Sequence, residues 1–131
     1  MENDIKTQPP NISFEEFSTI DLRLGKIKKI EYIPKLNKVY KAEIDLGFEK
    51  RIVVLGAAMY YKPEELEEKL VIVCTNLSPK TIGNTESKGM ILALDGMEGR
   101  PIFLTIDTEE QVELGLKFIS FKRLSYKILT D

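Results

Sequence analysis

The sequence of 131 residues contains no histidine. This absence removes the commonest general base, the commonest metal ligand and the usual partner of a serine or cysteine nucleophile. The sequence also offers no acid/base pair, metal-ligand cluster or phosphate-binding glycine motif in its place. We therefore predict that the protein is not an enzyme and uses no metal or other cofactor.

Cysteine is scarce as well, because Cys74 is the only one and lies within an apolar run. A disulfide framework and a cysteine-based metal site are thereby excluded within one chain. The apolar runs are far too short to span a membrane, and the first residues lack the basic and apolar segments of a secretory signal. We expect a cytoplasmic protein that does not associate with a membrane.

Acidic and basic residues nearly balance, for a net charge of −2, but they are unevenly distributed. Residues 22–41 contain seven basic side chains and one acidic side chain, a local charge of +6, and residues 115–131 are basic again. Such clustering can create a surface that attracts anions. Lysines also protect exposed strand edges from aggregation, and charge alone favours this second explanation.

The length predicts one domain, and its structure is expected to begin at Ser13. Residues 1–12 lack apolar periodicity and are interpreted as a mobile leader. The spacing of Ser13 and Glu16 is typical of a capping box, which predicts a short helical turn. Pro63, followed by two glutamates, predicts a second short helix.

Five segments have the length and composition of strands, and the second of them alternates strictly between apolar and charged residues. They comprise residues 22–32, 40–46, 51–55, 70–75 and 90–94. In the first segment the alternation breaks near Gly25, which would allow a bulge or bend that joins two sheets. Residues 76–90 form a long polar connection, which is usually functional or disordered.

The order of three strands, a short helix and two strands matches the five-stranded OB-fold barrel. We therefore predict a mainly β protein with an OB barrel over residues 13–108 and a C-terminal strand extension over residues 109–131. An SH3-like or split barrel is the structural alternative. In an OB barrel, the loop around residues 34–38 and the 76–90 connection would lie on one binding side.

Several short motifs then resemble a known family, the tRNA-binding domain of methionyl-tRNA synthetases and of free-standing structure-specific tRNA-binding proteins. The motifs that carry the resemblance are Phe14-Glu-Glu-Phe17, Asp21-Leu-Arg-Leu-Gly-Lys-Ile27, Lys38-Val-Tyr-Lys41, Asp45-Leu-Gly47, Tyr60-Tyr-Lys-Pro-Glu-Glu-Leu66, Asn76-Leu77, Pro79 and Glu86-Ser-Lys-Gly-Met90. The resemblance implies an OB barrel that binds folded tRNA, usually as a homodimer closed by its terminal extensions.

The resemblance also implies a tRNA-contacting surface that includes Asn76, Ser87 and Met90. Asn76 and Ser87 can hydrogen-bond phosphate, ribose or base edges, and Met90 can pack under a base. The structural alternative is that the two polar side chains bond local backbone and that Met90 belongs to the core.

Basic residues complete the predicted tRNA-binding set. Lys80 and Lys88 lie in the 76–90 connection and Lys38 lies in the first loop, whereas Arg23, Lys41 and Arg51 are strand residues that could instead pair with acids across the sheet. Relatives commonly carry basic residues where this chain has Ser78, Thr81 and Gly83. Fewer phosphate contacts predict a weaker affinity for tRNA than is typical.

The leading functional hypothesis is a non-catalytic module that binds tRNA and assists aminoacylation, with methionyl-tRNA synthetase as the expected partner. The alternatives are a dimerisation or assembly module with weakened RNA binding, and a peptide-binding chaperone of the same family. The expected homodimer contact consists of apolar residues near the C-terminus, namely Phe118, Ile119, Phe121 and Leu124.

Overall fold

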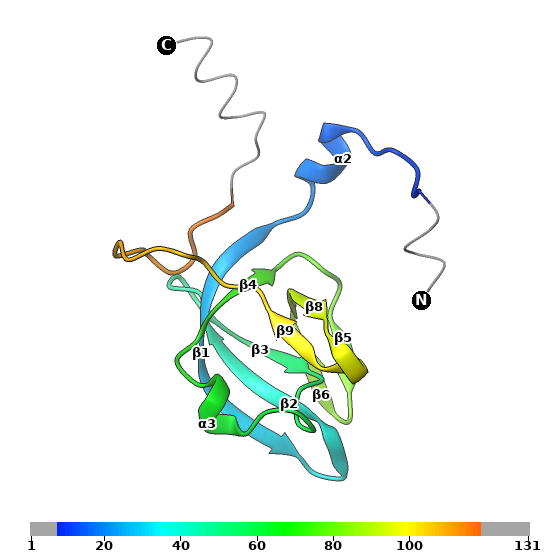
Figure 1. Cartoon of the computed structure of the whole chain (residues 1–131), viewed down its shortest axis with the longest axis vertical. Coiled ribbons are helices and arrows are strands. Elements are labelled where there is room, and N and C mark those ends of the chain that lie inside the picture. The colour runs from blue at the N-terminus through cyan, green and yellow to red at the C-terminus, as the bar shows by residue number, and fades with distance from the viewer. Residues whose placement is uncertain (1–7, 119–131) are drawn as a thin grey trace.

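The N-terminal part of the described chain is a short helix that precedes a long strand (Figure 1). The computed structural model describes residues 8–118, so residues 1–7 of the predicted leader lie outside it. Helix α2 (Phe14–Ser18) begins with the predicted capping box: Ser13 Oγ accepts a hydrogen bond from Glu16 N at 3.0 Å, and Glu16 Oε1 accepts one from Ser13 N at 3.0 Å.

Five antiparallel strands form the main sheet in the order β3-β2-β1-β4-β7. Their bounds are β1 (Leu22–Ile33), β2 (Leu36–Asp45), β3 (Lys50–Leu55), β4 (Leu70–Cys74) and β7 (Met90–Ile91). Helix α3 (Pro63–Leu66) lies between β3 and β4 in the sequence. The predicted mainly β architecture, with five strands in OB-like order and a short helix after the third, is confirmed.

The main sheet is not closed into a barrel, so the predicted closure is wrong at the level of the strand ladder. One edge strand, β3, is linked through isolated bonds to residues 87 and 88, which precede the other edge strand, β7. Lys88 N donates to Ile52 O at 2.9 Å, and Val54 N donates to Ser87 Oγ at 2.9 Å. The ladder stays open there because β7 is short and Ser87 accepts from β3 with its side chain rather than its backbone.

Strand β1 changes partners along its length. Residues 22–26 pair with β4, and the strand pairs with β2 from Lys26 onward. Register shifts fall between Ile27 and Lys29 and between Tyr32 and Ile33, so the bulge predicted at Gly25 lies further along the strand. Gly25 is required for another reason: a Cβ there would lie 2.8 Å from Ile44 Cγ2, because the strand crosses the core at close range.

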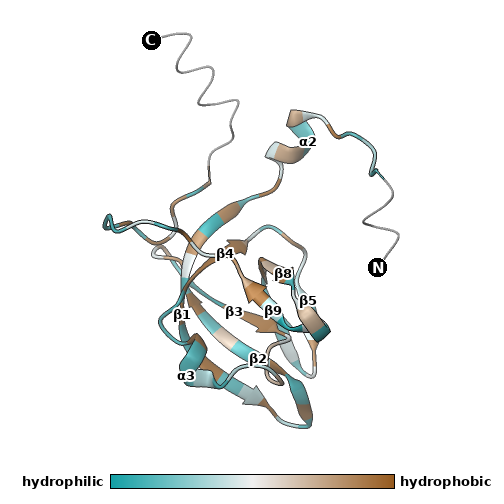
Figure 2. Cartoon of the chain, viewed as in Figure 1, coloured by the Kyte–Doolittle hydropathy of each residue, from teal (hydrophilic) through white to brown (hydrophobic). Residues whose placement is uncertain are grey.

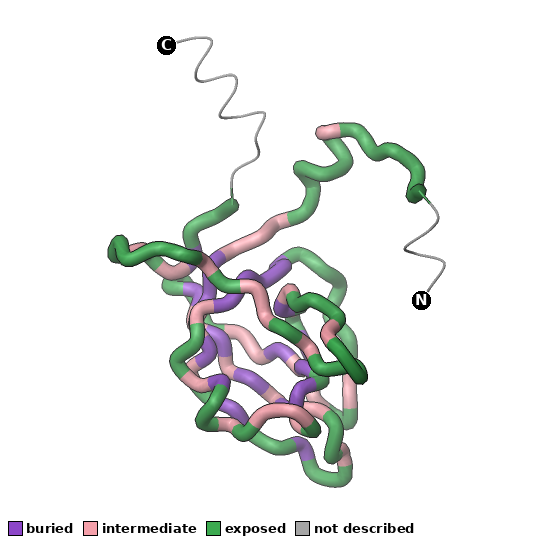
Figure 3. The backbone as a smooth tube through the Cα atoms, viewed as in Figure 1, coloured by how far each residue is buried: buried purple, intermediate pink, exposed green. Residues whose placement is uncertain are grey.

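The core lies inside the curve of this sheet, and the buried stretches of Figure 3 follow its strands. On β2 the buried residues are Tyr40, Ala42 and Ile44, followed by Leu46, as the alternation predicts. Leu66, the buried residue of α3, adds to the same core. Figure 2 shows the corresponding change of hydropathy along the strands.

The 76–90 connection contains a hairpin that the sequence analysis missed. Strands β5 (Lys80–Ile82) and β6 (Thr85–Ser87) pair across a two-residue turn. Gly83 and Asn84 occupy it with φ values of 53° and 67°, as a type I′ hairpin turn requires. Asparagine tolerates this left-handed conformation better than most other residues.

A second hairpin and a returning segment complete the described chain. Strands β8 (Ala93–Asp95) and β9 (Pro101–Phe103) flank the short 3-10 helix η1 (Met97–Gly99). Residues 115–118 then run along the start of β1, where Phe118 N donates to Leu22 O at 2.9 Å and Gly115 N donates to Leu24 O at 2.7 Å. The predicted final strand and the dimer residues Ile119, Phe121 and Leu124 extend outside the described residues.

Candidate nucleic-acid interface

Two tight turns from distant parts of the sequence face each other at one end of the sheet. One is the turn of Pro34 and Lys35 between β1 and β2, and the other is the Gly83-Asn84 turn of the β5–β6 hairpin. A Cβ added at Gly83 would overlap the Leu36 side chain, so the turns are in contact. Between them lies an open groove of about 450 Å³. The structure thus brings together the two loops that we expected on one binding side.

Ion pairs neutralise much of the basic segment 22–41. Lys28 Nζ lies 2.8 Å from Glu68 Oε2, with Lys26 beside the same carboxylate, and Lys29 Nζ lies 3.7 Å from Glu31 Oε2. By contrast, no ion pair within residues 8–118 engages the remaining three lysines of the segment, Lys35, Lys38 and Lys41. The unneutralised charge is therefore concentrated in the first turn and on β2.

Lys41 and Lys80 belong to one continuous row across four strands. Lys41 is opposite Val54 in the β2–β3 ladder, Val54 N donates to Ser87 Oγ, and Ser87 is opposite Lys80 in the hairpin. Lys80 is exposed, and no ion pair within the described residues engages it. We use the name lysine row for Lys41 and Lys80 together with Lys35 of the first turn and Lys38 of β2, which also form no ion pair within the described residues. Lys35 and Lys41 line the groove on its β1–β2 side, and Lys80 lies further along the hairpin whose turn forms the other wall.

Ser87 is buried, with 7% of its surface exposed. Its hydroxyl accepts from Val54 N at 2.9 Å and donates to Gly89 O at 3.3 Å. Both bonds are to backbone, one of them across to β3. In this structure Ser87 fastens the hairpin to the sheet, and its effect on a ligand would act through the position of Lys80.

Replacing Ser87 by alanine is expected to lower the free energy of unfolding by about 1–2 kcal/mol, because Val54 N loses its partner in a buried site. Urea unfolding measures the change. Thr85→Ala, in the same strand but only partly buried, is the matched control and should change stability by less. Equal stability of wild type and Ser87→Ala would contradict the assigned bond.

Asn76 also has its side chain engaged by backbone. Its Oδ1 accepts from Asp21 N at 2.9 Å, and its Nδ2 donates to Thr19 O at 2.5 Å. These bonds span more than fifty positions of sequence and tie the end of β4 to the junction of α2 and β1. The side chain therefore positions the start of β1.

The two arginines of the predicted set, Arg23 and Arg51, also bond backbone with their side chains, as Asn76 does. Arg51 Nη1 donates to Thr75 O at 2.5 Å and to Lys88 O at 3.3 Å, and Nη2 contacts Glu49 at 3.0 Å. Arg23 Nε lies 3.0 Å from Asp21 Oδ2, and its Nη1 donates to Gly115 O at 3.1 Å. These guanidinium groups hold strand ends together, and their charges are partly compensated.

Asp21 links three segments at the start of β1. Its carboxylate accepts hydrogen bonds from Thr75 Oγ1 and Arg23 and lies 3.6 Å from Lys117 Nζ. Partial burial opposes its ionisation, but the hydrogen bonds from Thr75 and Arg23 and the charges of Arg23 and Lys117 outweigh this effect and lower the pKa of Asp21.

Lys88 and Met90 remain accessible at the other end of the 76–90 segment. Lys88 Nζ lies 3.6 Å from Glu86 on the surface, and Met90 is 47% exposed, so Met90 is not a core residue. Of the predicted set, Lys41 lines the groove and Lys80 lies on the hairpin whose turn forms its other wall. The sequence analysis missed Tyr32 and Thr85, which also line the groove. The turn pair Gly83-Asn84 was the signal that could have placed Thr85 there.

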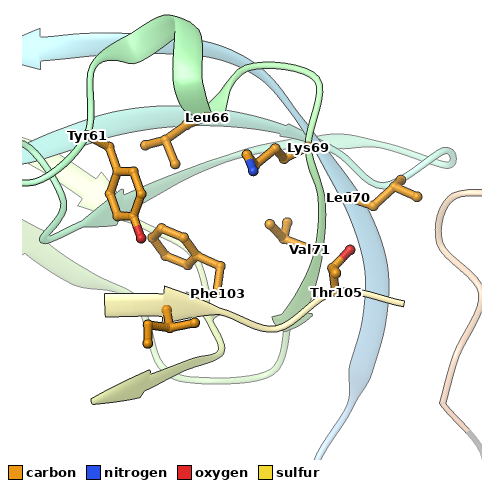
Figure 4. Close-up of a pocket in the computed structure, with 8 residues that line it drawn as sticks. Tyr61, Leu66, Lys69, Leu70, Val71, Phe103 and Thr105 are labelled. Carbon is orange, nitrogen blue, oxygen red and sulfur yellow. The ribbon is translucent and has the colours of Figure 1, made fainter. Parts of the chain in front are cut away.

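A separate apolar hollow of about 230 Å³ lies between α3, β4 and β9 (Figure 4). Tyr61 and Phe103 form part of it, with ring centroids 5.7 Å apart, and Lys69 supplies a charge. Within residues 8–118 no cluster of three or more histidine, cysteine or acidic residues could hold a metal ion. No helix in this part of the chain is long and apolar enough to cross a membrane.

The chain belongs to the family of tRNA binding domains, whose model matches residues 22–117. This confirms the family resemblance. The methionine–tRNA ligase of Pyrococcus furiosus is 46% identical over 106 residues, which cover 81% of this chain and 14% of that enzyme. The ligase of Methanoregula boonei is 50% identical over 91 residues, 69% of this chain and 14% of that enzyme. The chain thus spans 14% of the length of these relatives.

Solved structures of two proteins have a similar fold over nearly all of the described chain. A MetRS-related protein from Pyrococcus horikoshii has a TM-score of 0.77 and 32% identity, and the match covers 85% of this chain and 100% of that chain. The CsaA chaperone protein of Picrophilus torridus has a TM-score of 0.73 and 30% identity, covering 83% of this chain and 100% of that chain.

Proposed function

We propose that this protein is a non-catalytic module that binds tRNA at the groove between the two facing turns. The observation that carries the proposal is the lysine row: in a member of a tRNA-binding family, Lys35 and Lys41 line this groove without ion pairs in the described chain, and Lys80 is unpaired on the adjoining hairpin. Lysines there would contact phosphates and lower the free energy of RNA binding through counterion release. Shape rather than base sequence would give most of the preference.

The predicted site residues would divide into two groups under this proposal. Lys38, Lys41, Lys80, Lys88 and Met90 are accessible enough for direct contact with RNA. The other four, whose polar side chains hydrogen-bond backbone, would position the contact surface, and these are Arg23, Arg51, Asn76 and Ser87.

Replacing Lys41 or Lys80 by glutamine is expected to weaken tRNA binding severalfold and to reduce the slope of log K against log salt by about 0.7–0.9 for each phosphate that the protein no longer neutralises. A tRNA titration over a salt series measures both quantities. Lys69→Gln, an exposed lysine that lines the apolar hollow instead, is the control and should change neither. The proposal is wrong if wild-type affinity is independent of salt, or if all three variants bind alike.

We further infer that the module serves a methionyl-tRNA synthetase in the cytoplasm and assists aminoacylation as a homodimer. The similarity to methionine–tRNA ligases supports the enzyme partner. The exposed apolar side chains Leu116 and Phe118, which lie along β1, support a second chain there. Light scattering of the full chain tests the dimer. A stable dimer that does not bind tRNA would instead favour the alternative of an assembly module.

Peptide binding is a second candidate, favoured by the similarity to the CsaA chaperone protein and by the apolar hollow of Figure 4. An unfolded client protein should then aggregate less in the presence of this chain. Phe103→Ser should remove that protection while tRNA affinity stays unchanged. Protection that survives the substitution would exclude the hollow as the peptide site.

A further inference from the structure

Tyr32 is an exposed aromatic side chain at the wall of the groove. It is 65% exposed and lines both the groove and a neighbouring hollow of about 290 Å³ in front of Tyr60 and Tyr61. Its ring meets the buried ring of Tyr40 edge-on, with centroids 5.2 Å apart and an interplanar angle of 67°. Tyr32 is therefore held on one side by the core and still presents a large aromatic surface to solvent.

Lys35 stands beside Tyr32 in an unusual backbone conformation. It follows Pro34 in the two-residue turn and has a φ of 68°, where glycine or asparagine is the usual residue. A lysine there costs conformational free energy, and such positions cluster at ligand sites. The ammonium group of Lys35 forms no ion pair within the described residues.

The charge around the groove favours an anion next to Tyr32. Lys35 and Lys41 both line the groove without ion pairs in the described chain, whereas the acid of the same wall, Glu31, already lies 3.7 Å from Lys29. On the opposite wall, the Asn84 amide and the Thr85 hydroxyl can donate and accept hydrogen bonds. In the β1–β2 ladder Tyr32 is opposite Tyr40, whereas Lys41 is opposite Glu31 and points to the other face, so Lys35 in the turn is the cation that can act together with the Tyr32 ring.

We propose that this groove holds a single unpaired nucleotide of the bound RNA, its base stacked on Tyr32 and its phosphate beside the ammonium group of Lys35. The inference rests on the proposed function and deepens it, because it names the part of the RNA that the groove binds. Base stacking on an aromatic side chain tolerates any base. The site therefore reads the presence of an unpaired nucleotide rather than its identity.

The test compares a blunt RNA duplex with the same duplex carrying one bulged nucleotide. Wild type should bind the bulged RNA about tenfold more tightly, the range expected for one stacked base. Tyr32→Ala should lose this preference and keep its affinity for the blunt duplex, whereas Tyr32→Phe should keep both. Lys35→Gln should weaken binding of the bulged RNA more than Lys69→Gln does. Equal binding of both RNAs by wild type, or an intact preference in Tyr32→Ala, overturns the proposal.

A spectroscopic measurement makes the result independent of how well the variants fold. With 2-aminopurine at the bulge, wild type should quench its fluorescence by stacking, and unchanged fluorescence on binding overturns the proposal. A tRNA titration run in parallel separates the two claims. Binding of bulged RNA without binding of tRNA would overturn the proposed function and leave the nucleotide site standing. Binding of tRNA without any preference for the bulged RNA would overturn the nucleotide site and leave the proposed function standing.

Discussion

Replacing Tyr40 by alanine is expected to lower the free energy of unfolding by about 3–5 kcal/mol, the range for deleting a large buried aromatic side chain. Tyr40 is 1% exposed at the centre of β2, and its hydroxyl donates to Tyr61 O at 2.5 Å. The substitution would leave a cavity in the core and an unpaired carbonyl in the segment between β3 and α3. Chemical unfolding with linear extrapolation measures the loss.

Tyr40→Phe is the matched control, because it keeps the ring and removes only the hydroxyl. We expect a loss of about 1–2 kcal/mol from the broken hydrogen bond. An equal loss in both variants would show that the ring contributes nothing, contrary to its complete burial. In the alanine variant Tyr32 would also lose its edge-on support, so RNA that contacts Tyr32 should bind more weakly to the fraction that remains folded.

The pH dependence of stability measures the contribution of the Tyr40 hydroxyl separately from that of its ring. Burial, aided by the adjacent Tyr32 phenol, raises the pKa of Tyr40 to about 12 from its ordinary value of 10.0. Below pH 10 the Tyr40 hydroxyl is neutral in both the folded and the unfolded chain, and its contribution to stability is complete. As pH rises from 10 toward 12 the unfolded chain ionises first, so stability falls in this window. Tyr40→Phe should show a smaller fall, which unfolding at several alkaline pH values measures.

Much of the fold follows from local patterns in the sequence. Strand β2 is predictable because one row of side chains enters the core and the other faces solvent, so Tyr40 and Ile44 alternate with charged residues. The capping box at Ser13 and the proline at the start of α3 act on their own backbone within one turn, so each also predicts its element. These elements depend on neighbours close in sequence.

The site was less predictable because its polar side chains bond to partners far away in sequence. Nothing near Ser87 shows that its hydroxyl meets Val54, and nothing near Asn76 shows that its amide meets Thr19. The same composition fits a ligand contact and a backbone clamp equally well. Exposed charge was likewise hidden, because the acid that compensates Lys28 lies forty positions away at Glu68. Tertiary structure was needed to show which lysines remain without partners.

The hairpin shows why the structure of the 76–90 connection was hard to predict from the sequence. Its strands are short and its turn is tight, so periodicity over them is too brief to read. The hairpin is attached to β3 through Ser87 and contacts the first turn through Gly83. Polar residues of the hairpin that bond the backbone, such as Ser87, can thus set the distance between Lys80 and Lys41.

Removing the carboxylate of Asp21 is expected to cost about 2–3 kcal/mol of unfolding free energy, because several charge-assisted hydrogen bonds end on it. Asp21→Ala would leave the buried Thr75 hydroxyl without its carboxylate partner and would release Arg23 and Lys117. The start of β1, the end of β4 and residues 115–118 would then separate more easily. Hydrogen exchange of the amides of Phe118 and Thr75 should rise before that of the core.

Acid should reproduce part of this effect in the wild-type protein. The folded-state pKa of Asp21 is lowered below its ordinary value of 3.8, so the carboxylate contributes its full stability above that pH. The contribution is lost as pH falls through the lower folded-state pKa. Asp21→Asn should therefore be less stable than wild type at neutral pH and should approach it in acid. If the difference between the two proteins were the same at every pH, the ionised carboxylate could not be the source of the stability, and the bonds of Thr75 and Arg23 would have to be assigned to the neutral side chain.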